Sequence, residues 1–305
     1  MKKEFTKFCD NLKLTTLQNE DAKTKYTGVV KKLHDSYYES NFDGSTKFLF
    51  GSHKTNTNIR PITEHQDVDV LFKISEETFE KFDNYESNGQ SALLQELKGY
   101  LDEKYTSTNK ISGWGKVVLI KFSDNTHNVE VLPAYEQVNG TFLIPNTENG
   151  GSWDEFNPRE QVTSFQNSNF KTNGLTADLC RMMKSWVQNT ETLNYSSYIL
   201  MQDIIMFLEE EYEEGVDYCE YHNVIKNFLD GLKNNCDSVV LKHVTTAHNR
   251  VVKAIEFIDD DKPKEASIEL IKIFGSLFPK ISNNPIKESR GQSRVFIAPS
   301  APWRK

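Results

Sequence analysis

The stretch that decides the fold is FLFGSHKTNTNIRPITEHQDVDVLFKI, residues 48–74. Two apolar runs, 48–50 and 68–74, enclose a polar loop that begins with Gly51 and Ser52. The second run contains β-branched residues and alternates as a half-buried strand does. Asp67 and Asp69 are two residues apart in it, so their carboxylates project from one face, while the intervening valine points to the core. The stretch therefore predicts two strands, the second with paired acids on one face.

A third carboxylate occurs in the later strand-like run NVEVLPA, residues 128–134, where Glu130 lies between two valines. Three acids on one sheet face would repel each other unless a cation lay between them. Oxygen ligands of this kind suit Mg²⁺, with substrate phosphates completing the coordination. Two closely spaced metals can activate a hydroxyl and stabilise a leaving pyrophosphate. Asp67, Asp69 and Glu130 are thus predicted to hold two Mg²⁺ ions, with Mn²⁺ as a possible substitute.

Gly51 and Ser52 follow the first apolar run directly. Glycine lets the backbone approach a phosphate closely, and the Ser52 hydroxyl can donate a hydrogen bond to it. A helix starting just beyond would direct backbone N–H groups at the same anion. A glycine-serine turn or a DxD pair alone is common and uninformative. Their combination with the later acidic strand predicts a site for a nucleoside triphosphate and metal.

The periodicity divides the chain in two. Residues 17–38 and 90–105 have helical spacing, and 116–122, 128–134 and 141–144 are strand-like. From Leu175 onward only helical patterns occur. We therefore predict an α+β fold, with a mixed-sheet lobe over residues 1–160 and an all-helical lobe over 161–305 that ends in a surface tail. The long N-terminal helix is expected to bridge the two.

Composition excludes several classes of protein. The 305 residues carry a net charge of −8, which argues against broad electrostatic binding to DNA or to an anionic membrane. The four scattered cysteines form no CxxC pair and suit a reducing compartment. No apolar run approaches the length of a membrane span, and the N-terminus has no signal-peptide pattern. We expect a cytoplasmic protein.

The motifs GSHKTNTNIRP (51–61), DVDV (67–70), VEVLPA (129–134), NGTFLIP (139–145), GSWDEFNP (151–158) and IFGSLFP (273–279) together resemble one family. This is the CD-NTase family, the cyclic-oligonucleotide synthases of bacterial anti-phage (CBASS) systems. They are relatives of animal cyclic GMP-AMP synthase among the polymerase-β-like nucleotidyltransferases. The resemblance extends from about Thr46 to Pro279. One departure is visible, because the third acid is Glu130 where the family more often has aspartate.

The resemblance implies roles for individual residues. Asp67, Asp69 and Glu130 would bind the catalytic Mg²⁺ ions, and Gly51 and Ser52 would hold the triphosphate. Lys184 in LCRMMKSW matches a family lysine that contacts the triphosphate. Ser197 and Tyr198 in NYSSYILMQDI resemble a serine-tyrosine pair that touches phosphate and stacks on a base.

Simpler interpretations exist for the later residues. Lys184 alone would be read as a surface lysine on an amphipathic helix. Ser197 and Tyr198 would be read as a helix N-cap followed by a core tyrosine. Lys54 and Arg60, in the loop after the glycine-serine turn, are either phosphate contacts or solvated charges. The Cys and His residues between 219 and 248 match no standard zinc spacing, so a zinc-bearing DNA-binding insertion is not expected.

The predicted activity is a Mg²⁺-dependent nucleotidyl transfer between ribonucleoside triphosphates, with pyrophosphate release. By resemblance, a second round would close a cyclic di- or trinucleotide that activates a separate effector protein. The enzyme itself is expected to be a monomer or weak oligomer. Two alternatives stay open: a non-cyclising nucleotidyltransferase with a linear, RNA, protein or small-molecule product, and a nucleotide-binding regulator without catalysis.

Overall fold

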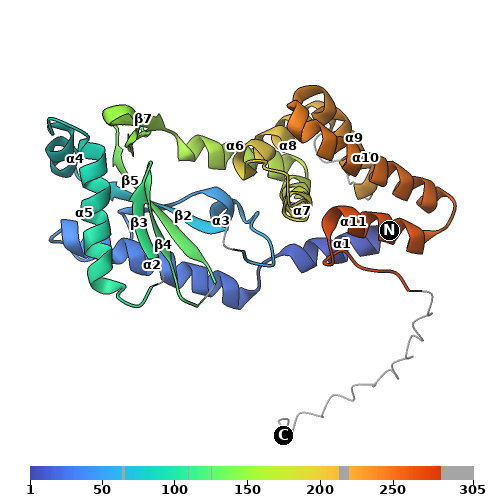
Figure 1. Cartoon of the computed structure of the whole chain (residues 1–305), viewed down its shortest axis with the longest axis horizontal. Coiled ribbons are helices and arrows are strands. Elements are labelled where there is room, and N and C mark those ends of the chain that lie inside the picture. Colours follow the sequence, from blue (N-terminus) through green and yellow to red (C-terminus); the bar gives the residue numbers. More distant parts are fainter. Residues whose placement is uncertain (64–65, 109, 125, 213–219, 283–305) are drawn as a thin grey trace, which may run out of the picture.

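The computed structural model describes residues 1–63, 66–108, 110–124, 126–212 and 220–282. They form two lobes side by side, one built on a sheet and the other made only of helices (Figure 1). Two connections join the lobes: the N-terminal helix pair runs along one side, and helix α6 (Pro158–Lys171) crosses on the other. The α+β class with a mixed sheet and a helical second half is confirmed.

Within the described residues the sheet has seven strands, of which five lie in the order β1-β2-β5-β4-β3, while β6 pairs with β5 and β7 pairs with β6. Among the strand pairs in the part of the chain that the structure describes, only β2 and β5 are parallel, and the other pairs are antiparallel. The strands are β1 (Lys47–Leu49), β2 (Asp67–Ile74), β3 (Lys110–Trp114), β4 (Val117–Lys121), β5 (Asn128–Glu136), β6 (Phe142–Asn146) and β7 (Ser152–Phe156). The acidic strands β2 and β5 are thus direct neighbours.

Of the described helices, α2 (Thr16–Tyr37), α4 (Glu76–Asp83) and α5 (Gly89–Lys104) lie in the same lobe as this sheet. Residues of α2 and α5 share one apolar core with the alternating valines of β2 and β5. Val68, Val70, Val129 and Val131 are all fully buried, whereas the polar positions between them are partly accessible. This alternation places the three acids on the opposite face of the two strands from the core.

The helical lobe contains α7 (Leu175–Gln188), α8 (Ser197–Glu211), α9 (Tyr221–Asn235), α10 (Ser238–Asp259) and α11 (Pro263–Phe274). A separate apolar core joins them, and helix α1 (Lys2–Leu12) contributes Phe5, Phe8 and Leu12 to it. The N-terminal segment of the chain is therefore shared: α1 packs with the helical lobe and α2 with the sheet. A capping box at Thr15 and Gln18 starts α2 as a separate helix.

The long helix, the acidic strands and the late helical run agree with the sequence patterns. Described elements that were not predicted individually include α1, α4, β3, β7 and α6. Strand β7 begins after two glycines and is half-buried at most, so it lacks a strong apolar alternation. None of the described helices has both the length and the apolar character that a membrane crossing requires. The tail after residue 282 lies outside the described residues.

Candidate active site

The three acids lie on adjacent parallel strands. Asp69 is in register with Glu130, and Asp67 is in register with Asn128. The Asn128 side chain donates a hydrogen bond to Asp67 Oδ1 at 3.0 Å. The register therefore brings residues 61 positions apart in the sequence onto one face, as the alternation predicts, and Asn128 orients one of the carboxylates.

Gly51 brings a short helix against these acids. It has a φ of +63° and begins α3 (Gly51–Thr55) directly after β1. A Cβ at this position would lie 2.2 Å from Asp69 Oδ2, so a side chain cannot fit without moving the carboxylate. Phe50 N–H donates to the Asp69 carbonyl at 3.4 Å, which holds the strand end beside β2. Glycine is thus required here both by conformation and by contact.

A cleft of about 1320 Å³ opens over the acids, between the sheet and the helical lobe. Its volume exceeds the range of about 300–1,000 Å³ usual for small-molecule sites, so it has room for more than one mononucleotide. All eight residues singled out from the sequence line it: Gly51, Ser52, Asp67, Asp69, Glu130, Lys184, Ser197 and Tyr198. They come from α3, β2, β5, α7 and α8, so the cleft unites both halves of the chain.

The carboxylates carry more negative charge than their surroundings balance. Burial, together with the charges of Glu130 and Asp67, raises the pKa of Asp69 to about 7. Burial and the charge of Asp67 also raise the pKa of Glu130. Desolvation lowers the pKa of Lys184, whose charge partly offsets that of Asp69. An arrangement of clustered oxygen donors with uncompensated charge fits hard divalent cations.

The three acids supply suitable ligand atoms for a divalent cation, but their side chains are not arranged around a common point. No group of three or more His, Cys, Asp or Glu side chains within the described ranges is arranged so that it could hold an ion. Asp69 turns towards Gly51, and Asp67 accepts from Asn128. Rotation of these side chains would be needed for all three acids to share metal ions.

The helical wall of the cleft supplies the other polar groups. Lys184 is half-buried on α7 and donates to Thr57 Oγ1 at 3.2 Å, so it does not occupy an exposed helix face. Ser196 is the N-cap of α8, and Ser197 is its first helical residue. Tyr198 is 48% exposed and therefore does not belong to the core. Its ring is available at the cleft, as stacking on a base would require.

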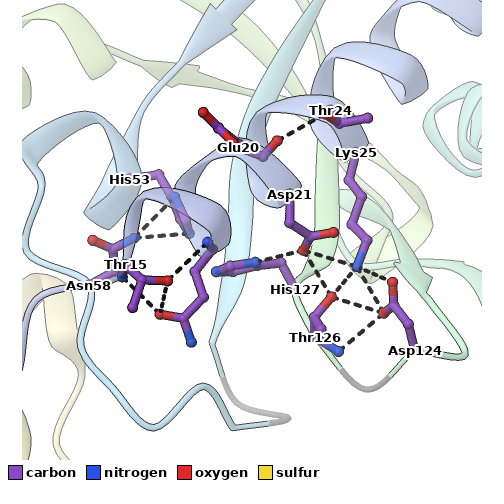
Figure 2. A network of polar contacts seen from close by, with 11 residues as sticks. Thr15, Glu20, Asp21, Thr24, Lys25, His53, Asn58, Asp124, Thr126 and His127 are labelled. Carbon is purple, nitrogen blue, oxygen red and sulfur yellow. Dashed lines mark hydrogen bonds and ion pairs between the residues drawn. The ribbon is translucent and has the colours of Figure 1, made fainter.

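A polar network lies around His127 and around His53, which belongs to the same short helix as Gly51 and Ser52 (Figure 2). His127 is buried, donates from Nδ1 to the Asp21 carboxylate on α2 at 3.1 Å, and contacts the ring of His53 on α3 edge-on. The Asn58 side chain lies 3.0 Å from His53 Nδ1. Burial and the neighbouring charges of His127 and Lys184 lower the pKa of His53 to about 3, so His53 is neutral. The network ties α3 to α2 and to the turn before β5.

Other candidates lie elsewhere. Arg60 donates to the Asp10 carbonyl at the end of α1 at 3.1 Å, and the exposed Lys54 does not line the cleft. His248 pairs with Asp230, and Cys219 lies outside the described residues. Sequence reasoning missed Asn128, Thr57 and Asn58. Of these, only Asn128 could have been found from the sequence, because it is two residues before Glu130 in the same strand pattern and so lies on the same face.

Comparisons with known proteins agree with this geometry. The sequence model for the Second Messenger Oligonucleotide or Dinucleotide Synthetase domain (SMODS) matches residues 1–169. A search of curated protein sequences gives no match.

Two solved structures share the fold over most of the chain. CdnC of Escherichia coli MS115-1, in complex with HORMA-deltaN, has a TM-score of 0.66 and 14% identity, over 91% of this chain and 98% of that chain. The cyclic AMP-GMP synthase DncV of Vibrio cholerae, in complex with the linear intermediate 5′ pppA(3′,5′)pG, has a TM-score of 0.69 and 12% identity, over 88% and 93%.

Proposed function

The chain belongs to the family of second messenger oligonucleotide or dinucleotide synthetases, and we propose that it links ribonucleoside triphosphates into a cyclic di- or trinucleotide. The observation that carries this proposal is the single cleft that unites the acids, the glycine-serine turn, Lys184 and the Ser197–Tyr198 pair. The fold it shares with DncV, which has been solved with a linear dinucleotide intermediate, supports the same reaction.

Asp67, Asp69 and Glu130 would hold two Mg²⁺ ions. When bound, these ions supply a lowered pKa for the attacking hydroxyl and neutralise the donor triphosphate. The clustered carboxylates on β2 and β5 would supply the oxygen ligands. The raised pKa values of Asp69 and Glu130 reflect negative charge that bound cations would balance. Glutamate adds one methylene to the third ligand, which changes its reach but not its chemistry.

The chain's own groups bind and orient the reactants. The Gly51 backbone and Ser52 would receive the donor phosphates, with the Lys184 ammonium opposite them. The Tyr198 ring would stack on a base. A ribose hydroxyl of the acceptor forms the new bond to the α-phosphorus, and the bond to pyrophosphate breaks in line with it. A second round on the linear product would close the ring.

The experiment is incubation of the protein with Mg²⁺ and all four ribonucleoside triphosphates, followed by phosphatase and mass spectrometry. We expect a phosphatase-resistant cyclic product and stoichiometric pyrophosphate. Glu130→Asp should retain turnover, whereas Glu130→Gln should lose it, because the amide cannot supply a charged ligand. Absence of product with every nucleotide, in both Mg²⁺ and Mn²⁺, would contradict the proposal.

A phosphatase-sensitive product would instead identify a non-cyclising nucleotidyltransferase. Triphosphate binding without pyrophosphate release would identify a regulator. Because CdnC has been solved in complex with HORMA-deltaN, a protein partner is also part of the proposal, and the cyclic product would act on a separate effector in anti-phage signalling. Co-purification and product-dependent effector assays test these two relations separately.

A further inference from the structure

Helix α3 is too short to hold its own position. It has five residues, and an isolated helix of that length is unstable in water. It nevertheless carries Gly51 and Ser52 to the cleft. Its location must therefore be fixed by contacts from the rest of the protein, and the far end of the helix shows what these are.

The chain closes the end of α3 on Ser52 itself. Asn56 caps the helix in a left-handed conformation, with a φ of +54°. The backbone N–H groups of Asn56 and Thr57 both donate to the Ser52 carbonyl, the second at 2.9 Å. Any displacement of residues 56–57 is therefore transmitted directly to Ser52.

Helix α7 of the other lobe holds both of these residues. Arg181, which is 5% exposed, donates from Nη1 to the Asn56 carbonyl at 2.6 Å. One turn further along α7, Lys184 donates to Thr57 Oγ1 at 3.2 Å. A charged donor at a helix C-terminus is favourable because the last carbonyls carry partial negative charge.

The Arg181 side chain is itself held in place. Its Nη2 forms an ion pair with Asp178 at 2.5 Å, and the Tyr221 hydroxyl of α9 lies 3.4 Å from the other oxygen of Asp178. The guanidinium thus donates one hydrogen bond to Asp178 of its own helix and one to the Asn56 carbonyl at the end of α3. These two directed hydrogen bonds join the helical lobe to α3. It does not line the cleft, so its effect on a nucleotide must pass through α3.

We propose that Arg181 is a positioning residue that sets Ser52 against the donor triphosphate by anchoring the Asn56 carbonyl across the lobe boundary. This rests on the proposed function, because a triphosphate is the assumed ligand of Ser52. The consequence is that the affinity of the sheet-side phosphate site depends on a buried arginine of the helical lobe.

The test compares Arg181→Gln with Arg181→Lys and with Arg250→Gln. Arg250 is a partly exposed arginine of the same lobe that pairs with Glu269. Binding of α,β-methylene ATP and α,β-methylene GTP is measured with Mg²⁺, well below the lowest melting temperature of the set. We expect Arg181→Gln to weaken binding about tenfold, which is within the loss expected for a charged hydrogen bond. Arg181→Lys should recover part of it, and Arg250→Gln should bind as wild type.

Steady-state kinetics of the same variants give a second measurement. KM for the triphosphate should rise about tenfold in Arg181→Gln while kcat changes much less, because the three acids are untouched. Unchanged analogue binding in a folded Arg181→Gln variant overturns the proposal, as does an equal loss in Arg250→Gln. If Arg181→Gln does not fold, Arg181→Lys and Asp178→Asn are measured in its place, and unchanged binding in both overturns it. Wild-type pyrophosphate release tests the proposed function separately, since analogue binding needs no turnover.

Discussion

The two walls of the cleft place their polar groups in different ways. On the sheet wall, Asp69 and Glu130 occupy paired positions of adjacent parallel strands, and buried valines on either side of each fix their direction. On the helical wall, Lys184 projects from the middle of α7, and Ser197 and Tyr198 stand at the exposed start of α8. The face on which the acids lie is thus set by strand register within one sheet, whereas the position of the helical wall depends on how the two lobes pack together.

The largest effect is expected when one charge is removed from the sheet wall. Asp69→Asn preserves shape but removes a metal ligand, so we expect pyrophosphate release to fall at least about a thousandfold. Asp43→Asn, an exposed acid of the same lobe, is the control and should keep wild-type rates. Turnover of Asp69→Asn within tenfold of wild type would remove Asp69 from the metal assignment.

The next effect concerns the contact between α3 and the acids. Gly51→Ala would force a Cβ to within 2.2 Å of Asp69 Oδ2 and would strain a backbone with φ of +63°. We expect a loss of ~2–3 kcal/mol of stability and about a hundredfold lower kcat/KM. The measurements are thermal unfolding and steady-state kinetics.

Gly115 provides a matched control. It has the same φ of +63°, but nothing lies within 4 Å of a Cβ built there. Gly115→Ala should therefore show the conformational cost of ~1 kcal/mol without the loss of activity. If both variants lose activity equally, the contact with Asp69 does not explain the glycine at position 51.

The same contrast explains how far sequence reasoning reaches. The acids were predictable because a period of two is a local property, and two short strand patterns sufficed to put Asp67, Asp69 and Glu130 on one face. Resemblance was needed for Lys184 and Tyr198, because helical periodicity does not tell which polar residue faces a cleft. Arg181 and Thr57 carried no signal, because Arg181 donates to the Asn56 carbonyl and Thr57 accepts from Lys184. Both contacts join positions far apart in the chain and are set only by the packing of the lobes.

When metal is removed, the charge on the sheet wall should make the free energy of unfolding depend on pH. The pKa of Asp69 in the folded protein is about 7 against an ordinary value of 3.8, so the folded state binds the proton more tightly. Stability therefore falls as pH rises from 4 to 7 and stays lower above that. Without Mg²⁺ we expect a decrease of ~2 kcal/mol, less than the full shift would give because water reaches part of the carboxyl.

Thermal melts between pH 4 and 8 in the presence of a chelator measure this decrease. Asp69→Asn should flatten the dependence, because the amide does not titrate. Addition of Mg²⁺ should flatten it in the wild type as well, because a bound cation stabilises the charged form. A wild-type curve that coincides with that of Asp69→Asn under metal-free conditions would contradict the electrostatic account.

The smallest expected effect lies on the helical wall. Tyr198 is 48% exposed at the cleft, and loss of one base–aromatic stack costs ~1–3 kcal/mol, so Tyr198→Ala should raise KM for the preferred nucleotide about tenfold. Tyr198→Phe keeps the ring and should stay within twofold. Tyr85, 46% exposed in the sheet lobe and absent from the cleft lining, is the matched control, and Tyr85→Ala should not change KM.

Because stacking acts on binding and not on the acids, kcat should hardly change in Tyr198→Ala. A fall in kcat at constant KM would instead mean that the helical wall takes part in the chemical step, and the division of labour between the two walls would be wrong.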